Sequence, residues 1–165
     1  MTFRTALLFS PALTALVAGC PTTETCGELG EATLEMGVGE DDYAPLPSDG
    51  VITYVDGTQG GHHIFAGLRA TGILPGSAAN LDPASTPVVS YYLEQDGIDV
   101  AGYRELLKPF KRKPKAILEM EGEQLILFVT DPTTLIGVPL TLHADVTDAC
   151  GTHLEASAAV TLQPE

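Results

Sequence analysis

The chain has 165 residues, of which 22 are acidic and 8 are basic, so its formal net charge at pH 7 is −14. Such an acidic surface disfavours nucleic acid as a partner and, over most of its area, anionic lipid headgroups. Because 44% of the residues are hydrophobic and only 18% are charged, the chain is not a disordered acidic tail.

The first residues have the features of an export signal. Arg4 supplies one positive charge, and an apolar run from Ala6 to Ala18 follows it. This run is shorter than the roughly 20 apolar residues that a membrane-spanning helix needs, and Pro11 interrupts it. A charged start, a short apolar region and small residues before a cleavage point predict a secretory signal peptide.

The segment Leu16-Val17-Ala18-Gly19-Cys20 resembles the lipobox of bacterial lipoproteins. The resemblance implies that Cys20 is acylated, becomes the mature N-terminus and holds the protein to a membrane. In that family an aspartate after the cysteine favours the inner membrane, and Pro21 stands there instead, so we expect the outer membrane of the cell envelope. We therefore expect a signal peptide at 1–19, a lipidated tether at 20–31 and one domain at 32–165.

Two further cysteines, Cys26 and Cys150, would lie in an oxidising compartment, where a disulfide persists. We predict that they are bridged, because no third cysteine competes once Cys20 is acylated. The chain-entropy account gives roughly 4–5 kcal/mol for closing so long a loop. Two free thiols are the alternative.

The rest of the chain predicts short strands separated by turns, because apolar and polar residues alternate or β-branched residues gather between glycine- and proline-rich stretches. Strands are expected at 32–38, 51–55, 62–71, 88–94, 98–103, 116–120, 125–129, 140–147 and 154–162. Asp96-Gly97 predicts a tight hairpin, and Glu121-Gly122-Glu123 predicts another. Loops are expected at 40–50, 72–87, 108–115 and 131–139.

These strands, with no convincing amphipathic helix after the signal, predict an all-β fold. The alternating strands on either side of Asp148-Ala149-Cys150-Gly151 resemble the closing strands of bacterial immunoglobulin-like domains. The resemblance implies an immunoglobulin-like antiparallel β-sandwich of about 7–9 strands. The chain has no tryptophan, so the core tryptophan of antibody domains is absent, and the label describes architecture rather than function.

A second resemblance covers the middle of the chain. Gln59-Gly60-Gly61-His62-His63-Ile64, followed by Gly67-Leu68-Arg69, is similar to a pattern in uncharacterised lipoproteins of myxobacterial type. The resemblance agrees with the expected compartment and fold and implies no activity.

Positive charge is concentrated in one stretch. Six of the eight basic residues lie there: Arg104, Lys108, Lys111, Arg112, Lys113 and Lys115. Clustered like charges repel one another unless they stay solvated or meet an anion. A solvated loop is one interpretation. The other is that the five cations from 108 to 115 bind an anionic polymer, a headgroup or an acidic protein.

The direction of this stretch follows from a count of strands. Counting the predicted strands as alternately up and down from Cys26 puts the basic loop at the end away from the lipid anchor. The loop would then meet a partner across the gap rather than the headgroups of its own membrane.

The histidines and one acidic run are the remaining candidates. His62 and His63 are adjacent, so they point to opposite faces of a strand and cannot chelate one ion together. One of them would need His143 or His153 as a second ligand. Glu40-Asp41-Asp42 lacks the spacing and glycine of a calcium loop, which favours a solvated loop.

No catalytic signature is present: the chain lacks a Gly-x-Ser-x-Gly elbow, a zinc-type cysteine pair and a phosphate-binding glycine loop. We therefore predict a lipid-anchored structural or binding module, without a cofactor, that is attached to the membrane through Cys20. The alternatives are an enzyme whose site is built on loops and a periplasmic metal-binding protein that uses His62 or His63.

Overall fold

The computed structural model describes residues 25–58 and 60–165. Cys20 and the lipobox lie outside these residues. Within the described ranges the chain forms ten strands and two short 3-10 turns, so the predicted all-β class is confirmed. None of these residues forms a helix with the length and apolar character of a membrane span. The strands are β1 Thr33–Val38, β2 Ala44–Pro45, β3 Val51–Asp56, β4 His62–Thr71, β5 Val88–Gln95, β6 Ile98–Leu107, β7 Lys111–Arg112, β8 Leu118–Ile126, β9 Leu140–Thr147 and β10 His153–Pro164.

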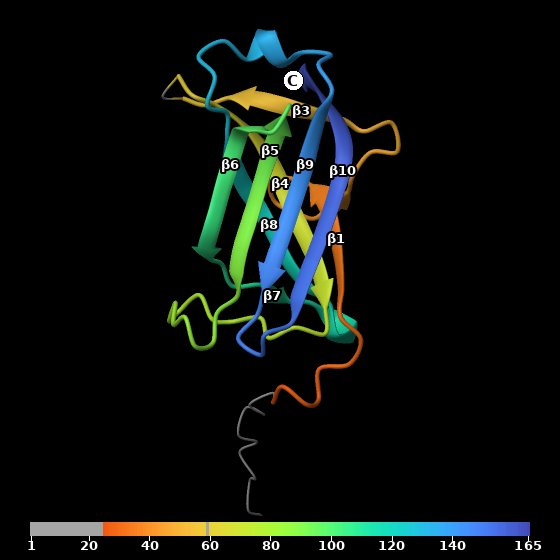
Figure 1. Ribbon diagram of the computed structural model, residues 1–165, viewed down its shortest axis with the longest axis vertical. Helices are drawn as coiled ribbons and strands as arrows, with labels where there is room; N and C mark the ends of the chain where they lie inside the picture. Colours follow the sequence, from red (N-terminus) through yellow and green to blue (C-terminus); the bar gives the residue numbers. More distant parts are fainter. Residues whose placement is uncertain (1–24, 59) are drawn as a thin grey trace, which may run out of the picture.

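The long strands form two layers (Figure 1). One layer has the order β10-β9-β5-β6, and the other has the order β2-β1-β4-β8-β7, with antiparallel pairing throughout. β3 crosses between the layers, pairing parallel with β10 and antiparallel with β4. At the other edge a bridge joins Ala101 of β6 to Leu127, just after β8. The sandwich is therefore joined along both edges, like a flattened barrel.

The core lies between the layers and is built by strand alternation. On β9, for example, Leu140 and Leu142 are buried while Thr141 and His143 point outward. Tyr91 of β5 is fully buried, and its hydroxyl donates to the carbonyl oxygens of Gly37 and Gly67 in the facing layer, at 3.2 and 3.1 Å. Burial raises the pKa of Tyr91, so the hydroxyl keeps the proton that links the two layers.

The predicted disulfide is present. Cys26 and Cys150 are bridged, with their Cα atoms 5.5 Å apart across 124 positions of sequence. We call this end of the sandwich the disulfide end and the opposite end the distal end. The disulfide end carries the segments 25–32, 72–87, 108–117 and 148–152. The distal end carries 46–50, 56–58, 60–61, 95–98, 128–139 and the C-terminus.

Two predictions about the path of the chain were wrong. Residues 121–123 form no hairpin, because β8 continues through them; Gly122, at φ 70°, belongs to a bulge opposite Gly67. β3 does not cross the length of the sandwich but lies over the distal end, and its pairing with β10 is parallel rather than antiparallel.

The orientation of the basic stretch is corrected as a result. Residues 108–115 lie at the disulfide end, not away from it. The backbone N–H of Lys108 donates to Pro87 O at 3.0 Å, and that of Phe110 donates to Pro75 O at 2.7 Å. The stretch therefore lies beside the 72–87 loop, whose Leu74 N–H donates to Asp148, two residues before Cys150.

Candidate functional site

The basic stretch is packed onto the body rather than extended into solvent. Phe110 is 5% exposed and belongs to the core. Lys111 and Arg112 form β7, which pairs with Leu118 and Glu119 of β8. The pairing places the cations next to the outward-facing carboxylates of β8.

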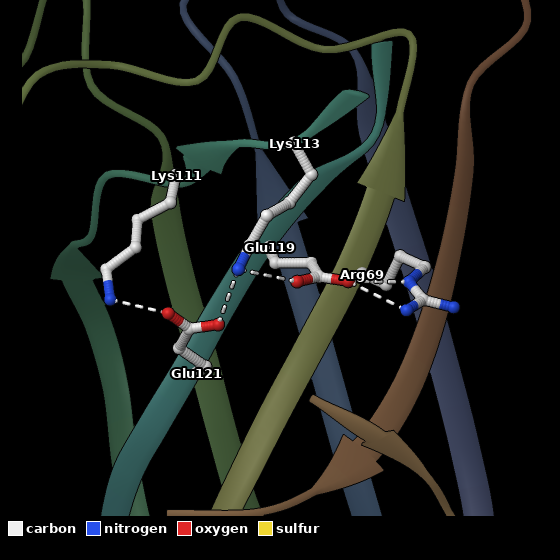
Figure 2. Close-up of polar contacts among 5 residues, drawn as sticks. All are labelled: Arg69, Lys111, Lys113, Glu119 and Glu121. Carbon is white, nitrogen blue, oxygen red and sulfur yellow. Dashed lines mark hydrogen bonds and ion pairs between the residues drawn. The ribbon is translucent and has the colours of Figure 1, made fainter. Parts of the chain in front are cut away.

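Figure 2 shows the resulting ion-pair network. Arg69 of β4 donates from Nε and Nη2 to Glu119 Oε1, at 2.9 and 2.7 Å. Lys113 Nζ lies 3.3 Å from Glu119 Oε2 and 3.1 Å from Glu121 Oε2. Lys111 Nζ donates to Glu121 Oε1 at 2.6 Å. Both glutamate side chains are only 8% exposed.

Carboxylates withdrawn from water to this degree are costly unless cations remain beside them. The hydrogen bonds from Lys111 and then Lys113 hold the pKa of Glu121 below its usual range. The repulsion expected from clustered cations is therefore relieved by anions of the same chain. The signal for this was present in the sequence, where Glu119 and Glu121 follow the basic stretch at alternate positions of one strand.

A second group involves Lys108. Its Nζ donates to Glu123 Oε2 at 2.6 Å, and the Tyr103 hydroxyl donates to the same oxygen at 3.2 Å. Three of the five cations proposed to bind an anion, Lys108, Lys111 and Lys113, thus have internal glutamate partners. Arg112 also has an interaction partner. Lys115 is exposed, and among the described residues it takes part in no ion pair.

The histidines do not converge on one point. His62 and His63 face opposite sides of β4, as predicted: His62 Nδ1 lies 2.7 Å from Asp56 Oδ1, while His63 packs edge-on against Phe65. His143 stacks on Tyr92 on the outer face of the other layer. Among the described residues, neither His62 nor His63 joins another histidine in a metal-binding group.

His153 lies between two carboxylates at the start of β10. Its Nε2 is 3.0 Å from Glu155 Oε1, and its Nδ1 is 3.5 Å from Asp145 Oδ1 and 2.9 Å from Thr147 Oγ1. Potential ligand atoms of Asp145, His153 and Glu155 lie within 4.8 Å of one another. The hydrogen bond with Glu155 and the charge of Asp145 raise the pKa of His153. Protonated His153 thus supplies the positive charge that this cross-strand acidic pair needs.

A cleft of about 880 Å³ lies at the distal end, and we call it the distal cleft. It lies between β3, the ends of β4 and β8, and the β1–β2 hairpin. Its apolar lining includes Val38, Val51, Val55, Phe65 and Ile126, and its polar lining includes Glu40, Asp56, His63, Gln124 and Glu165.

The described residues that line the distal cleft include acidic groups but no lysine or arginine. Glu40, Asp56 and Glu165 contribute carboxylates, and no lysine or arginine is among its described lining residues. His63 is 9% exposed, and its Nε2 is buried with no hydrogen-bond partner in the described part of the chain. The cleft therefore combines apolar walls with a negative rim, which favours an apolar ligand that carries positive charge.

No protein-family model, curated protein or solved structure matches this chain.

Proposed function

We propose that the chain is a lipid-anchored binding module of the cell envelope that presents the distal cleft to its ligand. The main support for this proposal is the position of the cleft, which lies at the end of the sandwich opposite the Cys26–Cys150 bridge. Only five residues separate Cys20 from Cys26, so a lipid on Cys20 would lie at most about 20 Å from the bridge. The cleft would then open away from the membrane.

The lining supports a specific class of ligand. A volume of about 880 Å³ falls in the range of about 300–1,000 Å³ that small-molecule sites occupy. Phe65 and Ile126 offer apolar contact, and the carboxylates at the rim select for a cation. We expect an amphipathic organic cation or a short basic peptide. An immunoglobulin-like arrangement of the strands and an outer-membrane location belong to the same proposal.

Anchoring is tested by Cys20→Ala. We expect this variant to accumulate as an unprocessed precursor without an acyl group, as measured by intact-protein mass and detergent-phase partitioning. Thr22→Ala, two positions along, is the matched control and should be acylated like the wild type. Maturation and membrane fractionation of Cys20→Ala at wild-type levels would contradict the anchor.

The cleft is tested with rhodamine 6G, an apolar organic cation, by fluorescence anisotropy. Ile126 is 50% exposed in the cleft, and Phe128 is 60% exposed two residues later, outside its lining. Ile126→Ala should weaken binding about tenfold, because it removes roughly 1–2 kcal/mol of apolar contact. Phe128→Ala should leave binding unchanged. Equal losses in the two variants, or equally tight binding of anionic fluorescein, would contradict the proposal.

A further inference from the structure

Two acidic side chains lie directly opposite one another on the outer face of the β10-β9-β5-β6 layer. Asp145 of β9 and Glu155 of β10 are cross-strand partners, and their side chains are 43% and 73% exposed. Like charges in this position destabilise a sheet, so a cation between them is favoured. The regular pairing of β9 with β10 keeps the two residues side by side.

His153 brings an imidazole to the same place. It pairs with Thr147, two residues further along each strand on the same face. Its Nε2 is 3.0 Å from Glu155 Oε1, and its Nδ1 is 3.5 Å from Asp145 Oδ1. The ring can supply the missing positive charge as a bound proton. As a neutral ring it can instead offer a nitrogen to a metal ion that supplies the charge itself.

The distances suit an ion of the size of Zn²⁺. Zn²⁺ binds nitrogen and carboxylate oxygen at about 2.0–2.2 Å with tetrahedral geometry, which puts neighbouring ligand atoms about 3.4 Å apart. The 3.5 Å between His153 Nδ1 and Asp145 Oδ1 already matches this separation. A ligand atom of Glu155 lies within 4.8 Å of ligand atoms on the other two residues. Its exposed side chain can close that distance by rotation about its own bonds.

The two carboxylates also line a hollow in which an ion and its water molecules have room. The hollow has a volume of about 380 Å³, and its lining includes Tyr92, His143 and Ser157 besides Asp145 and Glu155. Three protein ligands leave one position of a tetrahedral ion for water, which is the arrangement of accessible zinc sites rather than of closed structural ones.

We propose that Asp145, His153 and Glu155 bind one divalent transition-metal ion between β9 and β10, with Zn²⁺ as the best match. The imidazole distinguishes this donor set from the all-oxygen sites that Ca²⁺ and Mg²⁺ prefer. The ion ties the two strands together beside the disulfide end. His62 and Asp56 form a similar pair at the distal end, 2.7 Å apart, but among the described residues no third ligand joins them.

Isothermal titration of the full chain with ZnCl₂ tests the site. The protein is prepared without a histidine tag and treated with iodoacetamide, because a free thiol would bind Zn²⁺ as well. We expect one Zn²⁺ per chain and much weaker binding of CaCl₂. His153→Gln and Asp145→Asn should each weaken Zn²⁺ binding at least about tenfold, because even outer-shell partners contribute that much. His62→Gln, the matched control, should bind like the wild type.

Nuclear magnetic resonance locates the ion in the unmodified sequence, whether or not a variant folds. The chain has four histidines, and Zn²⁺ should shift the imidazole signals of His153 before those of the other three. Absence of Zn²⁺ binding, equally tight binding of Ca²⁺, an equal loss in His62→Gln, or an earlier shift of another imidazole overturns the site. None of these results affects the distal cleft, whose proposed ligand binds elsewhere.

Discussion

The two ends of this sandwich use charged residues in different ways. At the disulfide end, Glu119 and Glu121 are withdrawn from water and held by Arg69, Lys111 and Lys113. At the distal end the acids remain beside solvent: Asp131, for example, accepts from the backbone N–H and hydroxyl of Thr133, at 3.0 and 2.6 Å, in a loop.

Charged groups that pair with one another in the folded body hold the fold together, and we call them structural charge. Charged groups that remain solvated can meet a ligand, and we call them available charge. Removing a cation at the disulfide end takes one of the two cationic partners from a nearly buried carboxylate, which destabilises the fold. Removing an exposed distal acid that makes no side-chain hydrogen bond, such as Asp96, changes mainly the local potential, because water already solvates the group.

The largest expected effect comes from breaking the covalent tie at the disulfide end. The double variant Cys26→Ala, Cys150→Ala should lose about 2–5 kcal/mol of unfolding free energy, because the denatured chain is no longer constrained by the cross-link. Urea unfolding measures the loss. Hydrogen exchange should accelerate first in residues 25–32 and 148–152. Equal acceleration at the distal loops would mean that the two ends are not independently stabilised.

The next largest effect on stability is expected when one charge is removed at each end in turn. Lys113→Met keeps the length of the side chain but removes the cation shared by Glu119 and Glu121, and should lower the urea concentration at the midpoint of unfolding. Asp96→Asn, in the β5–β6 turn at φ 51°, keeps a residue that tolerates this conformation and should change stability by less than about 0.5 kcal/mol. Similar losses in urea unfolding would remove the distinction between structural and available charge.

Strand positions and faces could be predicted from the sequence because alternation depends on local pattern. The strands expected at 62–71 and 140–147 are β4 and β9, and alternation along β4 buries Ile64, Ala66 and Leu68 on one face. The path between strands could not be predicted. The count of strands treated β3 as crossing the full length of the sandwich and β8 as two strands. Each mistake exchanges the two ends for every later segment, so the two mistakes cancel by Cys150. The count therefore placed the basic stretch, which lies between the two errors in the sequence, at the wrong end.

The candidate sites, too, could be predicted only where they depend on local sequence. The cluster of cations was visible in the sequence, but its partners are on β8, and only the pairing of β7 with β8 brings them together. The distal cleft was missed because its walls come from β3, β4 and β8, which are separated in sequence. Its existence depends on β3 turning across the end of the sandwich, a feature that no local pattern encodes.

The smallest effect expected concerns His153, at the disulfide end beside Asp145 and Glu155. Its pKa is raised in the folded protein, so its contribution to stability is fully present below the unfolded value of about 6.5 and is lost as the pH rises through the folded value. His153→Gln should therefore lower Tm at pH 5.5 and have little effect at pH 8.5. Glu155→Gln removes the first cause of the shift, so adding His153→Gln to it should change Tm much less at pH 5.5. If His153→Gln instead lowers Tm equally at both pH values, the histidine contributes through packing and its hydrogen bond to Thr147, and the disulfide end holds no titrating ion pair.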